Sequence, residues 1–170
     1  MRATSRVADC SINTVTKLLV EAGAACRDYQ DKTIRNLKCR RDQVDGIWSF
    51  EGMKAQIVPE DQYGSPDSGD IWTWMALDAD SKLMVTWLVG GRDAGYAKAF
   101  MEDVAWRLRN RVQLPSDGHF AYLSAVESAF GGDVDYAMLV KKYGHAPDGQ
   151  RRYSPPICLG ANIQPVTARG

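Results

Sequence analysis

QVDGIWSF, at residues 43–50, is the stretch on which the interpretation of the whole chain depends. Its β-branched and aromatic residues are typical of a strand, yet Asp45 places a carboxylate where one face should be apolar. An ionised carboxylate is costly to bury without a partner, so a cation or a hydrogen-bond cluster is expected beside it. Taken alone, an edge-strand Asp that faces water is the simpler interpretation. A second acid changes the balance, because Asp117 lies in the stretch SDGH at residues 116–119.

The middle of the chain predicts a β-hairpin followed by a helix. Residues 71–78 and 83–90 are nearly continuous apolar runs separated by four polar residues, ADSK at 79–82, which are suited to a turn. Apolarity on both faces predicts central strands covered on both sides, with the tryptophans in the core. Residues 93–110 then have the apolar spacing of an amphipathic helix.

Asp117 follows the next predicted strand. Residues 112–114 form a short apolar run that stops at PSDG, so Asp117 is expected on the loop that leaves the carboxyl end of this strand. A helix comes next, and Gly131 and Gly132 are suited to end it. Residues 134–140 predict a fifth strand.

This order of elements predicts an α/β fold, an RNase H-like mixed five-stranded sheet with flanking helices. In such a core an Asp on the first strand and an Asp just after the fourth lie side by side. Two converging carboxylates repel each other unless a divalent cation neutralises them, and Mg²⁺ prefers oxygen ligands. Asp45 and Asp117 are therefore predicted as metal ligands and catalytic residues for phosphodiester displacement, with 71 residues between them.

Residues 1–26 predict a partial helix-turn-helix with Ser11 as a helix N-cap. An apolar stripe follows, and its members are Ile12, Val15, Leu18 and Leu19. Asn13, Thr14 and Lys17 point the other way, as the side chains of a major-groove recognition helix do. An ordinary amphipathic helix remains an equal alternative.

Residues 27–42 are polar and basic, and they predict a linker or a solvated helix. Residues 1–41 carry nine Lys and Arg against four Asp and Glu, whereas residues 42–170 carry twelve against seventeen. A basic arm on an acidic body is typical of binding a polyanion at one end. The side chains available for DNA phosphates are Arg35, Lys38, Arg40 and Arg41. A charged connector without a ligand is the alternative.

The sequence also resembles the DDE transposases of the insertion-sequence-one type, from about Met1 to about Gly160. The resemblance rests on RVA at 6–8 and TVTKLL at 14–19, on VD at 44–45 with IWSF at 47–50, on WTW at 72–74 with ALD at 76–78, on SDGH at 116–119 with Tyr122, and on DVDYAMLVK at 133–141. It implies a helix-turn-helix that reads transposon ends in double-stranded DNA and a core that cuts and joins DNA strands with Mg²⁺ or Mn²⁺. A homo-oligomer or a full-length transposase is the implied protein partner. Asp45 and Asp117 match the first two acids of the family's catalytic triad.

The chain departs from the family pattern in two ways. Gly46 stands where the family usually has Glu, and no Glu occurs after Glu127, which lies too early to be the third catalytic acid. We therefore expect a member truncated at both ends and catalytically incomplete, with a core at 43–145 that lacks its final helix and an irregular tail at 146–170. Two alternatives stay open: a non-catalytic DNA-binding remnant or accessory, or a metal-dependent nuclease on the same fold with His119 or Glu127 as a replacement group.

The remaining features favour a cytoplasmic protein without a membrane partner. The start of the chain has no signal-peptide pattern, and no apolar run is long enough to span a bilayer. The four cysteines have no short zinc-site spacing and are predicted to be unpaired thiols.

Overall fold

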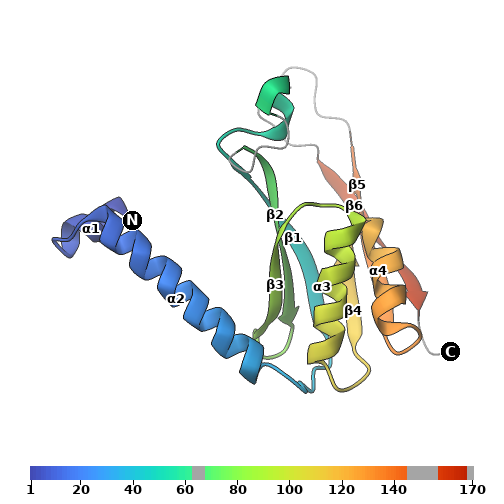
Figure 1. Cartoon of the computed structure of the whole chain (residues 1–170). Coiled ribbons are helices and arrows are strands. Elements are labelled where there is room, and N and C mark those ends of the chain that lie inside the picture. Colours follow the sequence, from blue (N-terminus) through green and yellow to red (C-terminus); the bar gives the residue numbers. More distant parts are fainter. Residues whose placement is uncertain (63–67, 145–156, 168–170) are drawn as a thin grey trace. The chain divides into compact units, whose positions relative to one another are not determined.

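The computed structural model describes residues 1–62, 68–144 and 157–167, and the chain divides into two compact units, Met1–Arg35 and Asn36–Gly170 (Figure 1). The unit boundary lies inside the predicted basic linker at 27–42. Each unit is described separately.

The first unit consists of two helices, α1 (Arg2–Val7) and α2 (Ile12–Thr33). Ser11 caps α2 as predicted, because its Oγ accepts a hydrogen bond from the amide of Asn13 at 3.2 Å. The helix continues past residue 26 to Thr33, so the first part of residues 27–42 is helical, which is one of the two forms that the sequence predicts. The apolar stripe of α2 is not buried, and neither helix contains a buried residue.

The second unit holds two three-stranded sheets. The first is antiparallel and consists of β1 (Asp42–Glu51), β2 (Gly69–Asp78) and β3 (Met84–Gly90). In the second, β5 (Asp135–Tyr143) pairs in parallel with β4 (Gln113–Asp117) and antiparallel with β6 (Cys158–Thr167). Two single-turn helices, Ala55–Ile57 and Glu60–Gln62, follow β1.

The two sheets meet where β1 and β4 begin. Arg41 and Gln113 form an isolated parallel bridge, and the amide of Gln113 donates to the carbonyl of Arg40 at 3.1 Å. The bridge makes β1 and β4 parallel neighbours. It also defines the register between the two strands, so residues at the same distance beyond Arg41 and Gln113 lie opposite each other.

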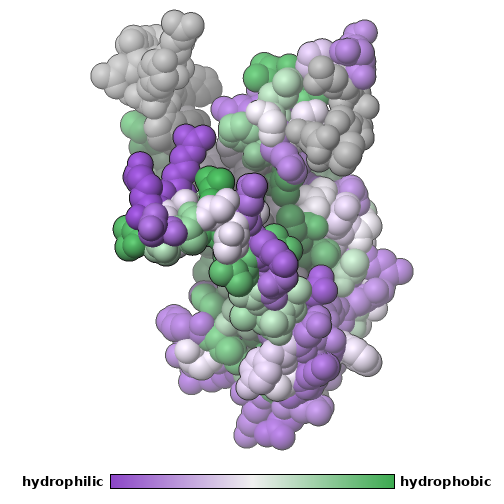
Figure 2. All heavy atoms as spheres, turned by 60° about the vertical axis from the view of Figure 1, so that its left-hand side comes forward, coloured by the Kyte–Doolittle hydropathy of each residue, from purple (hydrophilic) through white to green (hydrophobic). Residues whose placement is uncertain are grey.

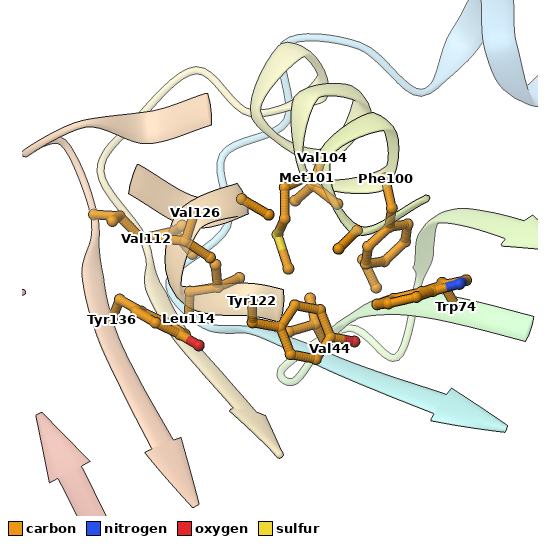
Figure 3. Close-up of a cluster of buried hydrophobic side chains, with 14 of the residues drawn as sticks. Val44, Trp74, Phe100, Met101, Val104, Val112, Leu114, Tyr122, Val126 and Tyr136 are labelled. Carbon is orange, nitrogen blue, oxygen red and sulfur yellow. The ribbon is translucent and has the colours of Figure 1, made fainter. Parts of the chain in front are cut away.

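Helices α3 (Ala94–Arg107) and α4 (Ala121–Phe130) pack against each other on one side of the sheets (Figure 1). Asp93 caps α3 by accepting from the amides of Gly95 and Tyr96, and Gly131 ends α4 with a positive φ of 53°. Between the helices and the strands lies the hydrophobic core, whose large members include Trp74, Phe100, Met101, Leu114, Tyr122 and Tyr136 (Figure 3).

The prediction of an irregular tail at 146–170 is wrong for its described part. Cys158–Thr167 forms β6, which pairs with β5 so that Ile163 lies opposite Leu139. Gly160 and Pro165 gave this segment its irregular pattern, but pairing with the open edge of β5 outweighs local propensity. Residues 145–156 and 168–170 lie outside the described part of the chain.

The prediction that the hairpin strands are covered on both faces is also wrong. Strand β3 is an edge of its sheet, and Trp87 and Val89 are 37% and 54% exposed. Their register partners on β2 are Met75 and Thr73, which lie on the face opposite to buried Trp74. Only the face toward α3 and α4 carries core residues among those described.

Arg111 fastens the start of β4 to β5, and replacing it with Met is expected to lower the free energy of unfolding by about 2 kcal/mol. Its guanidinium donates to the Asp135 carboxylate at 2.7 and 3.1 Å and to the carbonyls of Val134 and Gly132. The substitution removes these hydrogen bonds from partly buried acceptors. Urea unfolding measures the loss. Arg109→Met, on an exposed side chain, should change stability by less than about 0.5 kcal/mol; equal losses in both variants would contradict the prediction.

Candidate functional site

Asp45 and Asp117 occupy matching positions on two neighbouring strands. The parallel bridge joins Arg41 to Gln113, and each Asp lies four residues beyond its bridge residue. The burial pattern supports this register, because Val44 and Ser116, the residues before the two acids, are both buried. Side chains alternate between the faces of a strand, and neighbouring strands are about 4.8 Å apart. The register therefore places Asp45 and Asp117 at matching positions on neighbouring strands, and the meeting of their carboxylates at one ion stays a prediction.

The hydroxyl of Tyr122 gives independent support for this proximity. Burial raises the pKa of Tyr122 far above its usual value, and the charges of Asp117 and Asp45 raise it further. Both carboxylates thus lie within electrostatic reach of one hydroxyl group. Tyr122 projects from α4 into the core beside Trp74 and Val44 (Figure 3), and within the described ranges its hydroxyl has no hydrogen-bond partner.

Arg92, just beyond β3, is the cation nearest to this pair. Its Nη2 lies 3.8 Å from Oδ2 of Asp117, and its guanidinium lies 4.1 Å from the ring centroid of Trp72. The other Asp117 oxygen accepts from the amide of His119 at 3.1 Å, and Asp45 accepts from the amide of Gly46 at 2.8 Å. A small hollow of about 10 Å³ lies beside Asp117 and Arg92, and Asp45 is not part of its lining. The lining residues are Gly46, Trp72, Trp74, Arg92, Asp117, His119 and Tyr122.

The carboxylates of Asp45 and Asp117 are suitable ligands for a hard divalent cation, but two side chains alone do not fill the coordination shell of such an ion. The described residues contain no group of three or more His, Cys, Asp or Glu side chains placed to hold a metal. Mg²⁺ is often bound by one or two carboxylates, with water and substrate phosphates completing its shell. The donors present therefore fit such an ion, and the Arg92 guanidinium places positive charge at the same carboxylate.

The two replacement groups suggested by the sequence lie in different places, and only His119 lines the hollow. The His119 ring packs on Trp74 and Tyr122, each with a centroid distance of 5.9 Å. Burial, then the charge of Arg92, lowers the pKa of His119, and no described residue hydrogen-bonds to its Nε2. Glu127 is exposed on α4 and does not line the hollow.

The predicted DNA-binding side chains of the first unit are all on α2 or directly after it. Asn13, Thr14 and Lys17 are exposed, and Lys17 lies 3.7 Å from Glu21. Arg35 is held by Asp31 at 2.5 Å, so its charge is already partly neutralised.

In the second unit, Lys38 and Arg40 are exposed and line a hollow of about 480 Å³ together with Arg111. Arg41 instead pairs with Asp80 at 3.0 Å. Of the predicted phosphate ligands in this unit, Lys38 and Arg40 are thus the better placed.

Sequence reasoning missed Arg92, Trp72 and the position of the Tyr122 hydroxyl. The available signal was GGRD at 90–93, where a cation directly follows a strand that ends in two glycines. It could not be used, because the approach of Arg92 to Asp117 depends on how β3 and β4 are placed in three dimensions.

No protein-family model matches the chain, and no curated protein is similar enough to it to name as a relative. In the described part of the chain, no helix has both the length and the apolar character needed to cross a membrane.

Proposed function

We propose that this chain is a DDE transposase of the insertion-sequence-one type, which acts on phosphodiester bonds at the ends of a DNA element. The observation that carries the proposal is the matching position of Asp45 and Asp117 on parallel neighbouring strands. The motif resemblance and this placement point to the same two residues.

The arrangement of the second unit supports an RNase H-like core. With the bridge between Arg41 and Gln113, the strands follow the order β3-β2-β1-β4-β5, with β2 antiparallel to its neighbours and β4 parallel to β1 and β5. A helix follows β3 and another follows β4, which matches the expected order of elements. Strand β6 is an addition to that pattern.

In this proposal Asp45 and Asp117 hold Mg²⁺, for which Mn²⁺ can substitute. The ion supplies activation of an attacking hydroxyl and neutralisation of charge on the phosphate. Arg92 offsets the charge of Asp117, and Trp72 fixes the guanidinium through its ring face. Helix α2 and the basic side chains Lys38 and Arg40 contribute phosphate contacts.

The test uses a duplex that contains the DNA flanking the gene for this protein, incubated with the chain and Mg²⁺ or Mn²⁺. The sequence offers no third acid of the triad, so product formation decides between this proposal and the non-catalytic role below. Support for catalysis is the appearance of nicked or joined strands at defined positions. Asp45→Asn and Asp117→Asn should both abolish them, because each removes one of two metal ligands. Asp133→Asn is the matched control, since its side chain is 78% exposed and Asp133 lies two residues before β5, outside the lining of the hollow. Product that survives both site substitutions would overturn the proposal.

A non-catalytic DNA-binding role is the second candidate, and the absence of a third acid near the pair among the described residues favours it. In that case the wild-type chain binds the same duplex without forming product. Its affinity should fall steeply with salt, because each phosphate contact releases a counterion. A nuclease would instead degrade unrelated duplexes without preference for position.

A further inference from the structure

We propose that three aromatic side chains, Trp48, Phe50 and Trp72, form a platform on which unpaired nucleic-acid bases stack. These residues are called the aromatic strip below. The inference deepens the proposed function, on which it rests, by naming the state of the DNA that the site receives: a strand whose bases are separated from their partners.

The three rings lie on one face of the first sheet. Trp48 and Phe50 are two residues apart on β1, and their ring centroids are 5.7 Å apart. Trp72 is the register partner of Trp48 on β2. Trp48 and Phe50 are 40% and 48% exposed, whereas Trp74, the next residue on the same face of β2, is only 2% exposed. Along this face the side chains therefore change from the buried core at Trp74 to the exposed rings of Trp48 and Phe50.

Two cations accompany the rings. The Lys54 ammonium lies 5.4 Å from the Trp48 centroid and 5.9 Å from the Phe50 centroid, while Arg92 lies over Trp72. The nearest acid on this face, Asp70, accepts a hydrogen bond from the amide of Ala55 at 3.0 Å. Ring faces combined with Lys and Arg are the usual composition of sites that bind single-stranded nucleic acid, in which bases stack and phosphates meet cations.

The strip adjoins one member of the carboxylate pair, Asp117. Trp72 and Asp117 line the same hollow, and Arg92 contacts both of them. Gly46 lies beside the Trp72 ring, at a position where a Cβ would be in ordinary van der Waals contact with it, 3.4 Å away. A strand whose phosphate meets Arg92 beside Asp117 can therefore lay its adjacent bases over Trp48 and Phe50.

Binding of a fluorescent oligothymidylate, followed by anisotropy in EDTA, tests the inference. We expect Trp48→Ala and Phe50→Ala each to weaken binding about 10- to 100-fold, and Lys54→Ala to reduce its salt dependence. Trp48→Phe keeps a ring and should restore most of the affinity. The matched control is Trp106→Ala, on a tryptophan of α3 that is 75% exposed and far from the hollow, and it should bind as the wild type does. Trp48 and Phe50 are exposed, so circular dichroism should show that the Trp48→Ala and Phe50→Ala variants are folded.

Several results would overturn the inference: no binding by the wild type, equal weakening in the Trp106 control, or affinity that is unchanged in Trp48→Ala and Phe50→Ala. Affinity that depends on the rings but on neither salt nor Lys54 would indicate an apolar protein-docking surface instead. Because the assay contains no metal, Asp117→Asn should retain binding. If the wild-type chain binds the oligothymidylate through the strip but forms no cleaved or joined duplex, only the proposed function is contradicted. If it cleaves the duplex but does not bind the oligothymidylate through the strip, only the further inference is contradicted.

Discussion

Trp74→Ala is expected to lower the free energy of unfolding by about 4 kcal/mol, which is the cost of removing a large aromatic side chain from a packed core. Trp74 contacts Phe100 and Tyr122 at centroid distances of 5.9 and 5.4 Å. Its indole N–H donates to the carbonyl of Gly91 at 2.9 Å. The substitution therefore opens a cavity and leaves a carbonyl without its donor.

Urea unfolding followed by circular dichroism measures this loss. Trp74→Phe keeps ring packing but not the hydrogen bond, so it should cost about 1 to 2 kcal/mol. Trp106→Ala again serves as the control, because its exposed ring should be worth less than about 0.5 kcal/mol. A loss below 1 kcal/mol for Trp74→Ala would show that this ring does not anchor the core.

Asp42 is expected to make the protein less stable as the pH rises from about 4 to 7. Its side chain is fully buried, no described group hydrogen-bonds to either carboxylate oxygen, and its register partner is Asp78. Burial, then the charge of Asp78, raises the pKa of Asp42 to about 7. The folded chain thus keeps a proton that the unfolded chain releases near pH 4.

The sign of the effect follows from that difference. The contribution of protonated Asp42 to the free energy of unfolding is complete below the pKa that Asp42 has in the unfolded chain. It falls as the pH rises and levels off above about pH 7. The pKa difference of about three units corresponds to a total loss of about 4 kcal/mol. Hydrogen bonds from Ser81 lower the pKa of Asp78. The carboxylate of Asp78 therefore contributes to stability above about pH 4, and this contribution is lost only as the pH falls below about 4. Burial and these acids raise the pKa of the Cys39 thiol to about 11, and it therefore stays neutral. The nearby charges of Arg41 and Asp80 pair with each other.

Urea unfolding at pH 4, 5.5, 7 and 8.5 tests this prediction. Asp42→Asn cannot ionise and should lose the downward slope between pH 4 and 7, whatever its absolute stability. Asp80→Asn, on an exposed carboxylate of the same turn, should keep it. Parallel curves for the wild type and Asp42→Asn would contradict the prediction.

Local signals in the sequence predicted local structure well. Ser11 caps α2, and the carboxylate of Asp78 accepts from the Ser81 amide and hydroxyl in the turn before β3. The helix predicted at 93–110 is observed as α3 with its cap at Asp93. Each of these features depends on residues within a few positions of one another, which a sequence pattern records directly.

Features that depend on distant residues were harder to predict. Residues 27–33 lack an apolar stripe, so periodicity could not decide between a linker and a continuation of α2. Strand β6 contains Gly160 and Pro165 and becomes a strand through pairing with β5. For the site, the order of elements led to Asp45 and Asp117, whose role stays a prediction, whereas Arg92 could be found only from its place in the fold. Metal binding by that pair remains a prediction.

The isolated bridge between Arg41 and Gln113 has a mechanical consequence. Beyond it β1 and β4 belong to separate hydrogen-bonded sheets, so no backbone ladder fixes the distance between Asp45 and Asp117. Small rotations of one sheet against the other alter the gap between the two carboxylates without breaking a backbone hydrogen bond. If the pair holds a divalent ion as proposed, a gap of this kind would adapt to ions of different radius, whereas a rigid cage would select one of them.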